Sequence, residues 1–295
     1  MQIGVSSYSF NRLIQAGAMT PLDCPARAKE LGFDFIEYAA IPLPEGKSLR
    51  DYAAEIRRAA DRAEMPILNY AVGADLLTGS DGNLNEEVAR VMREVDVSEI
   101  LGAPTMRHDA SAGFGHAVAG SHSFDDALPR LIEGCRAITE YAAEKGIRTM
   151  VENHGHFCQD SARMENLVRG VAHANFGLLL DMGNFVCVDE DPLWAVQRLI
   201  PYAFFIHAKD FHLKSASTPF PGEGWALTRG GNFRRGAIFG HGNLPVLSCL
   251  RAICRAGYDG PLSVEFEGME EPMLGIRLSH ENLRRLLDLA GTAGQ

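Results

Sequence analysis

Short apolar segments alternate with helix-forming segments along the whole chain, and this alternation restricts the possible folds. The apolar segments resemble buried strands and cover residues 2–6, 34–38, 66–72, 104–109, 148–152, 176–181, 203–207 and 262–265. Because strands joined by helical crossovers pair in parallel, this order predicts a parallel sheet. Eight such units within 295 residues predict an α/β fold, the closed (β/α)8 TIM barrel, rather than an open doubly wound sheet.

Helical patterns and short connections separate the strands and indicate one domain, residues 1–295. We expect helices at 20–31, 49–64, 85–101, 125–145, 160–172, 192–199, 245–256 and 272–289. Thr20 before Pro21 predicts a capped start for the first helix. Residues 211–243 form the longest stretch without clear periodicity. Long loops in compact domains are usually lids or interface arms, so we expect one of these roles, with a solvated loop as the alternative.

The composition of the chain limits the kinds of molecule that the protein is expected to bind. The apolar share of 46% and the charged share of 22% are typical of a soluble globular protein. A net charge of −10 argues against binding of a nucleic-acid backbone, whereas local arginines still permit a small anionic substrate. The six cysteines lack metal-binding spacings, the first residues do not resemble a signal peptide, and no apolar run approaches a membrane span. We expect a cytoplasmic protein without membrane partners.

Four strands in the second half end in residues that can bind a metal ion: Glu152, Asp181, His207 and Glu265. Side chains two residues apart share a face of a strand, so small or apolar residues precede each polar one on the same face. The carboxyl ends of the barrel strands meet at one mouth. Each residue alone is better explained as an ordinary polar strand end, but four at equivalent ends favour a single site.

The composition of this set predicts its chemistry. Two Glu, one Asp and one His suit one divalent metal ion, preferably Mn²⁺, with Mg²⁺, Co²⁺ or Zn²⁺ as alternatives. Such an ion polarises a carbonyl group and stabilises an enediolate. A carboxylate on each side of the substrate carbon can remove a proton and return one.

These motifs resemble those of the xylose-isomerase-like barrel superfamily, which contains sugar isomerases and epimerases, inosose dehydratases and apurinic endonucleases. The resemblance spans the whole chain and is carried by residues 35–37, 151–155, 180–185, 207–210 and 264–267. It implies that Glu152 and Glu265 are the catalytic acid/base pair as well as metal ligands, and that Asp181 and His207 complete the metal site. Asn184 stands where ketohexose epimerases and the endonucleases have His, which together with the acidic charge argues against DNA repair.

Further polar residues at the expected mouth are candidates for substrate binding. We expect contacts from Glu37, which ends the second strand, and from His108, His154, Asn184, Lys209 and His241. For Glu37, the alternative is a hydrogen bond to a residue that supports the site. Lys209 shares a strand face with His207, and its alternative role is an ion pair with Asp210. For His241, which flanks the long loop, the alternative is an ordinary polar loop position.

The resulting prediction is a divalent-metal-dependent isomerase or epimerase that acts on a sugar-like hydroxy ketone or aldehyde through an enediolate. The alternative is a lyase, a dehydratase of a keto-inositol or keto-sugar that starts from the same intermediate. A non-catalytic sugar-binding barrel is a third reading, against which both acid/base carboxylates argue. The family resemblance also implies a homo-oligomer.

Overall fold

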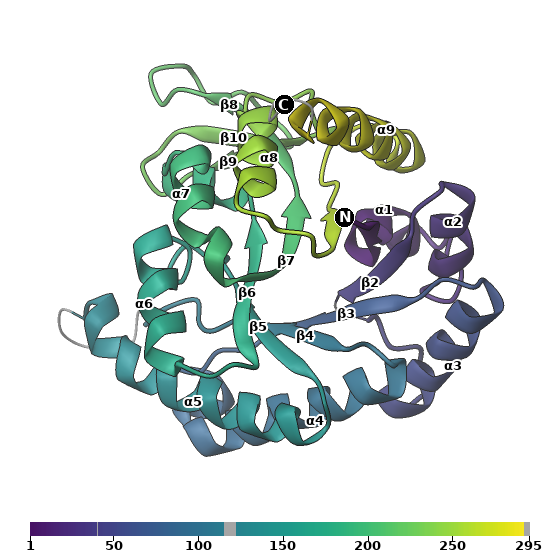
Figure 1. The fold of residues 1–295 in the computed structure, drawn as a ribbon, viewed down its shortest axis with the longest axis vertical. Coiled ribbons are helices and arrows are strands. Elements are labelled where there is room, and N and C mark those ends of the chain that lie inside the picture. The colour runs from purple at the N-terminus through teal and green to yellow at the C-terminus, as the bar shows by residue number, and fades with distance from the viewer. Residues whose placement is uncertain (40, 115–121, 292–295) are drawn as a thin grey trace.

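Eight parallel strands close into a barrel with helices around it (Figure 1). This computed structural model describes residues 1–39, 41–114 and 122–291. The strands are β1 (Ile3–Ser6), β2 (Phe35–Ala39), β3 (Ile67–Val72), β4 (Thr105–His108), β5 (Arg148–Glu152), β6 (Phe176–Asp181), β7 (Ala203–Ala208) and β11 (Leu262–Val264). Their order around the barrel is β1-β11-β7-β6-β5-β4-β3-β2. The predicted (β/α)8 barrel is therefore confirmed. The other residues of the expected domain 1–295, namely 40, 115–121 and 292–295, lie outside the described ones.

The helices follow the expected order, with differences at the start of the chain. They are α1 (Asn11–Gln15), α2 (Cys24–Glu30), α3 (Leu49–Arg62), α4 (Leu84–Leu101), α5 (Phe124–Glu144), α6 (Ser161–Val171), α7 (Pro192–Leu199), α8 (Val246–Arg255) and α9 (Pro272–Gly291). The sequence did not predict α1, and α2 starts at Cys24 rather than after Thr20. The Thr20 backbone N–H donates to the Asp23 carboxylate at 2.8 Å, which makes a turn before the helix. None of the helices in the described ranges is long and apolar enough to span a membrane.

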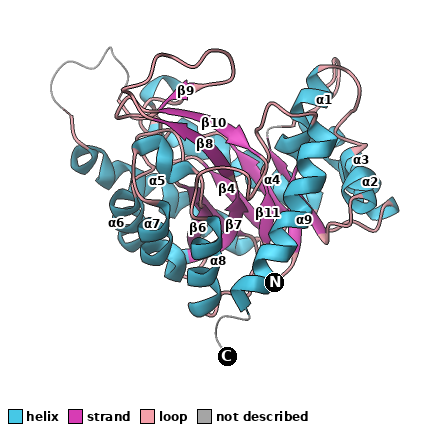
Figure 2. Ribbon diagram, turned by 90° about the horizontal axis from the view of Figure 1, so that it is seen from above, coloured by secondary structure: helices cyan, strands magenta, loops and turns pink. Residues whose placement is uncertain are grey.

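The segment expected to be a long loop contains a small antiparallel sheet. Its strands are β8 (Asp210–Lys214), β9 (Ala226–Leu227) and β10 (Phe233–Ala237), in the order β8-β10-β9. The prediction of an irregular loop was wrong because β8 pairs with a strand about twenty residues away, in a glycine-rich sequence with little alternation. Figure 2 shows this sheet above the barrel strands, at the end opposite both chain termini.

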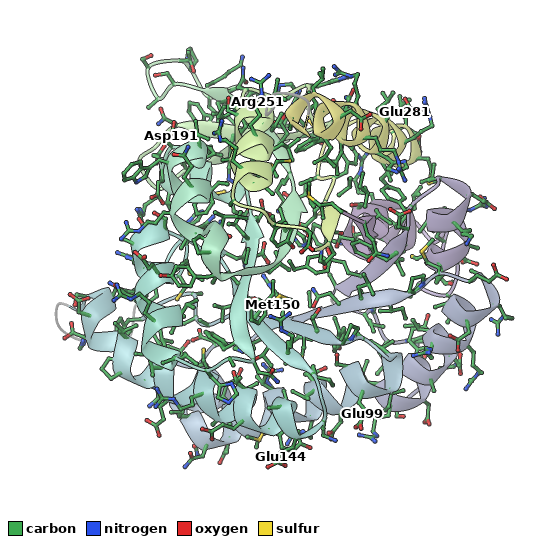
Figure 3. The ribbon with its side chains drawn as sticks, viewed as in Figure 1. Glu99, Glu144, Met150, Asp191, Arg251 and Glu281 are labelled. Atoms are coloured by element: carbon green, nitrogen blue, oxygen red, sulfur yellow. The ribbon has the colours of Figure 1, made fainter. Side chains whose placement is uncertain are left out.

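The barrel interior is filled by a cluster separate from the main core under the helices. It consists of Phe35, Met150, Leu179 and Phe205, all fully buried. Met150 is labelled near the centre of the ring in Figure 3. Each of the four lies two residues before a polar residue of the expected site. The strand period therefore carries those polar side chains to the same inner face, one layer closer to the mouth.

Gly4 on β1 makes room for this packing. A Cβ atom at position 4 would lie 2.1 Å from Cε2 of the Phe35 ring, which is far inside van der Waals contact. Because Phe35 is fully buried, its ring cannot move away without disturbing other interior side chains. Glycine at this position is therefore a requirement of the barrel core.

We expect Gly4→Ala to lower the free energy of unfolding by about 1–3 kcal/mol, the usual cost of overpacking a close-packed core. Urea titration followed by circular dichroism measures this change. Gly291→Ala is the control, because a Cβ atom there meets nothing within 4 Å. Equal stability of Gly4→Ala and the wild type would contradict the packing analysis.

Candidate functional site

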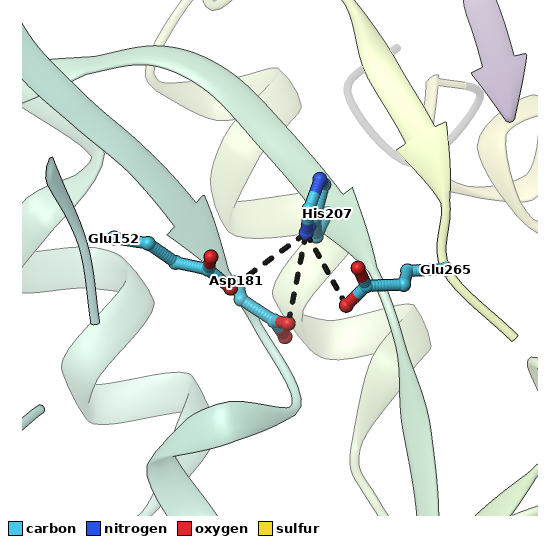
Figure 4. A group of neighbouring side chains, drawn as sticks. All are labelled: Glu152, Asp181, His207 and Glu265. Atoms are coloured by element: carbon cyan, nitrogen blue, oxygen red, sulfur yellow. Dashed lines mark ion pairs between the residues drawn. The ribbon is translucent and has the colours of Figure 1, made fainter. Parts of the chain in front are cut away.

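The four strand-end residues converge at the mouth of the barrel (Figure 4). Glu152, Asp181, His207 and Glu265 each place one ligand atom so that all four atoms lie within 4.8 Å of one another. The Nδ1 atom of His207 is 3.5 Å from Glu265 Oε2, 3.7 Å from Glu152 Oε1 and 3.8 Å from Asp181 Oδ2. The convergence expected from strand parity is therefore present in the structure.

The orientation of His207 is fixed from the side away from the carboxylates. Its Nε2 donates to Glu37 Oε1 at 2.5 Å, and Glu37 Oε2 accepts from Asn69 Nδ2 at 2.9 Å. Nδ1 thereby faces the carboxylates, and it has no hydrogen-bond partner among the described residues. A buried imidazole nitrogen aimed at three carboxylates, with its other nitrogen bound to a carboxylate, fits the role of a metal ligand. Of the two roles considered for Glu37, the structure has the supporting one: Glu37 lies behind His207 and does not line the pocket.

Asp181 is held by its own backbone surroundings. Its Oδ1 accepts the backbone N–H groups of Gly183 at 2.7 Å and Asn184 at 3.1 Å. The amide of Asn153 pairs with both backbone groups of Asp181, at 2.8 and 2.9 Å. Oδ2 is left for the cluster, because its carboxylate cannot rotate without breaking these bonds. The sequence analysis did not assign this role to Asn153, although its place directly after Glu152 was visible.

Lys209 supplies a positive charge to the cluster. Its Nζ lies 2.5 Å from Glu265, 3.0 Å from Asp181 and 3.3 Å from Glu267. Burial acts to raise the pKa of Glu265, but Lys209 and His207 outweigh it and lower that pKa to about 2. The alternative pairing with Asp210 is wrong. The Asp210 carboxylate instead accepts backbone N–H groups, from Phe211, Gly240, Gly242 and Leu244.

Arg107 is the second buried cation of the site, and the sequence analysis missed it. Its Nη2 lies 2.5 Å from Glu152 Oε2 and 2.8 Å from Asp109 Oδ1. In the register of β4 and β5, Arg107 lies beside Met150, whose side chain points into the barrel. The side chain of Arg107 therefore points to the same inner face. Adjacent strand residues point to opposite faces, so His108 faces away from the mouth and does not line the pocket. The prediction that His108 contacts substrate was therefore wrong.

The other expected contacts divide between the site and the surface. His154 Nδ1 lies 3.0 Å from Asp109 Oδ1 at the pocket wall. Asn184 donates to Glu152 Oε1 at 3.0 Å and accepts from Lys209 at 3.3 Å. His241 is exposed and lines neither pocket near the cluster, since the turn after β10 carries it outward. Its expected role in the site is therefore not supported by the structure.

A pocket of about 280 Å³ opens onto the cluster. Its lining includes three of the four converging residues, both buried cations and an exposed aromatic ring: Glu152, His207, Glu265, Arg107, Lys209, Tyr8, Ala39, Ala71, Val72, Gly73, Asp109, His154 and Glu267. A small polar molecule in this pocket would contact Glu152, His207 and Glu265 as well as both cations.

The sequence profile of a family described as the xylose isomerase-like TIM barrel matches residues 25–286. The chain belongs to this family. An inosose dehydratase of Lacticaseibacillus casei is 27% identical over 195 residues, 62% of this chain and 63% of that relative's length. An L-ribulose-5-phosphate 3-epimerase of Salmonella heidelberg (strain SL476) is 22% identical over 280 residues, 90% of this chain and 89% of the epimerase.

A solved structure shows the same fold. It is a xylose isomerase-like TIM barrel protein from Mycobacterium smegmatis in complex with magnesium. The TM-score is 0.67 at 20% sequence identity, over 92% of this chain and 88% of that one. The relatives of this xylose isomerase-like chain thus include a sugar epimerase and a dehydratase, and a barrel of the same fold has been solved with a divalent ion.

We expect Glu37→Gln to weaken Mn²⁺ binding by about 10- to 100-fold, the usual effect of removing the partner that orients a ligating histidine. The amide replaces the acceptor of the His207 proton with a weaker one and removes one negative charge. Isothermal titration with Mn²⁺ measures the change, with Asp181→Ala as the variant that has lost a ligand atom. Unchanged affinity in Glu37→Gln would show that Glu37 does not orient His207 for a metal ion.

His108 makes stability depend on pH. Burial lowers the pKa of His108 from 6.5 to about 4. Between these values the unfolded chain binds a proton that the folded chain does not, so the free energy of unfolding falls as the pH drops through this range. We expect His108→Asn to show a shallower fall between pH 6.5 and pH 4 in urea titrations. His241→Asn, which changes an exposed histidine, should follow the wild type, and parallel curves for all three proteins would refute the assignment.

Proposed function

We propose that the protein is a divalent-metal-dependent isomerase or epimerase that acts on a sugar-like hydroxy ketone or aldehyde. The observation that carries the proposal is the pair Glu152 and Glu265, whose oxygens lie 3.7 and 3.5 Å from the unpartnered Nδ1 of His207 at one pocket. The similarity to a sugar epimerase over most of the chain supports the same reaction class.

The proposed metal ligands are Glu152, Asp181, His207 and Glu265. Three carboxylates and one imidazole form an oxygen-rich set for which Mn²⁺ is our first choice, followed by Mg²⁺, Co²⁺ and Zn²⁺. When bound, such an ion polarises the substrate carbonyl and stabilises negative charge on its oxygen.

The carboxylates of Glu152 and Glu265 would move the proton. One removes a proton from the carbon next to the substrate carbonyl, which leaves an enediolate. The other first takes a proton from the Lys209 ammonium group or from solvent, and then gives it to the opposite face of that carbon in an epimerase or to the neighbouring carbon in an isomerase. The first carboxylate releases its proton to solvent when the product leaves. Arg107 fixes the free oxygen of Glu152, and Lys209 fixes Glu265. These two contacts limit the rotation of both side chains, so each carboxylate stays directed at the pocket.

A dehydratase is the second candidate, and Lys209 is the observation that favours it. Its Nζ, in the wall of the same pocket, lies 2.5 Å from Glu265. After a carboxylate has removed the proton, this ammonium group could donate a proton to the departing hydroxyl, which leaves as water. The similarity to an inosose dehydratase supports this branch.

The whole chain would act as one domain on a small molecule. Arg234 of β10 lines the pocket beside the cluster, so we propose that the small sheet serves as a cover over the barrel mouth. Such a cover would limit the access of water to an enediolate.

We expect Glu152→Gln and Glu265→Gln each to lower kcat by at least about 10²-fold, since each removes a general acid or base. The measurement is a screen of keto-sugars and inososes with Mn²⁺ in deuterated water. Reprotonation leaves deuterium in an isomeric product, whereas dehydration leaves an enone that absorbs ultraviolet light.

Glu165→Gln is the matched control, because Glu165 pairs with Arg198 on neighbouring helices and should keep full activity. Circular dichroism checks that the fold of each variant survives. Turnover retained in both site variants would eliminate the proposed mechanism.

A further inference from the structure

A second pocket of about 220 Å³ adjoins the pocket of about 280 Å³ at the proposed metal site. The two share His154, Lys209 and Glu267, so one substrate molecule can reach both. The wall that belongs to the second pocket alone includes Arg234, together with Gly155, His156, Gln159, Asn184 and Cys187. We call this second space the Arg234 pocket.

Arg234 reaches this pocket from the small sheet. In β10 it pairs with Leu213 of β8 and Ala226 of β9, and its guanidinium lies over the Phe211 ring, 5.1 Å from the centroid. Its Nε is buried without a hydrogen-bond partner, and no carboxylate in the described part of the chain forms an ion pair with it. Leaving a buried charged donor unsatisfied is costly, so Arg234 is a donor that a ligand can satisfy.

The other cations near the Arg234 pocket are already neutralised. Arg229 pairs with Asp160 and also donates to the backbone oxygen of His156 at 3.3 Å. Lys209 is engaged by carboxylates, including Glu267, the acidic residue in the lining of this pocket, at 3.3 Å. Arg234 therefore stands out as a cation without a counter-ion among the described lining residues.

The charge around His156 is consistent with this. Partial desolvation, followed by the positive charges of Arg234 and Arg229, lowers the pKa of His156. The same positive potential that disfavours a proton on His156 favours an anion in the Arg234 pocket.

We propose that the Arg234 pocket binds an anionic group of the substrate, a carboxylate or a phosphate, while the sugar-like part lies at the metal centre. The planar fork of a guanidinium matches both groups and can bind them through two parallel hydrogen bonds. The inference rests on the proposed function, since it assigns one substrate to both pockets. It narrows the substrate class to anionic sugar derivatives.

The neighbouring residue Arg235 provides a matched control. It lies next to Arg234 on the same strand, so its side chain projects to the opposite face of the sheet. There its guanidinium lies over the Trp225 ring, 5.3 Å from the centroid. Its Nε is also buried without a hydrogen-bond partner, so the two arginines differ in that Arg235 does not line the Arg234 pocket. Arg235→Gln removes the same charge from the same strand without changing the proposed anion site.

The test is isothermal titration in the presence of Mn²⁺ with three probes: D-fructose, D-fructose 6-phosphate and 5-keto-D-gluconate. We expect the wild type to bind one of the anionic probes at least about tenfold more tightly than fructose, the effect of one charge-assisted hydrogen bond. Arg234→Gln should lose this preference and keep its affinity for fructose, whereas Arg235→Gln should keep the preference. The preferred anionic probe identifies whether the group is a phosphate or a carboxylate.

Three results would overturn the proposal: equal affinity of the wild type for neutral and anionic probes, no binding of either anionic probe, or equal loss in both arginine variants. Thermal unfolding of the two variants confirms that they fold. The titration does not require turnover, so it is separate from the proposed reaction. An anion preference combined with full activity of both Glu152→Gln and Glu265→Gln would refute the mechanism and leave the Arg234 pocket established.

Discussion

Closure of eight parallel strands places every strand's carboxyl end at one mouth, and the candidate site depends on this constraint. Residues that are far apart in the chain, such as Glu37 in β2 and His207 in β7, become hydrogen-bonded neighbours because both side chains point inward from barrel strands. The interior layer below them is apolar and fully buried. These polar side chains can therefore form hydrogen bonds and ion pairs only with one another and with groups toward the mouth. The barrel thus acts as a rigid frame that sets the positions of the ligand atoms without help from flexible loops.

The same frame concentrates negative charge. Six carboxylates lie around the cluster, those of Glu37, Asp109, Glu152, Asp181, Glu265 and Glu267. Arg107 and Lys209 are the buried fixed cations that contact them. Buried carboxylates are costly unless they are paired, and a divalent ion would offset two more of these charges. Nδ1 of His207, which has no hydrogen-bond partner among the described residues, and Oδ2 of Asp181, which Lys209 contacts at 3.0 Å, lie where such an ion would find its ligands. The two cations hold the acids in place whether or not such an ion is bound.

Most of the barrel and the core of the site could be predicted because both follow from the strand period. Four polar strand ends with matching parity indicated one cluster, and the structure has it. The sequence did not predict Arg107 as a site residue because β4 carries polar residues on both faces. Only the register with Met150 of β5 shows which face of β4 points into the barrel. The small sheet of β8 and β10 was not predicted because its strands are separated in the sequence. A local residue pattern does not show with which distant strand a segment pairs. The exposed position of His241 follows from that same sheet.

The hydrogen bonds of Asp210 determine where sequence changes can occur without disturbing the barrel. Its carboxylate accepts backbone N–H groups from Phe211, at the start of the small sheet, and from Gly240, Gly242 and Leu244, just beyond its end. The segment that contains the small sheet therefore leaves the barrel and returns to it at one place, where the Asp210 carboxylate holds both of its ends. Insertions, deletions or substitutions between these anchors can reshape the Arg234 pocket without moving the proposed metal ligands. The proposed anion site and the proposed metal site thus occupy separately variable parts of one chain, which would allow one barrel to acquire new substrates by exchanging its cover.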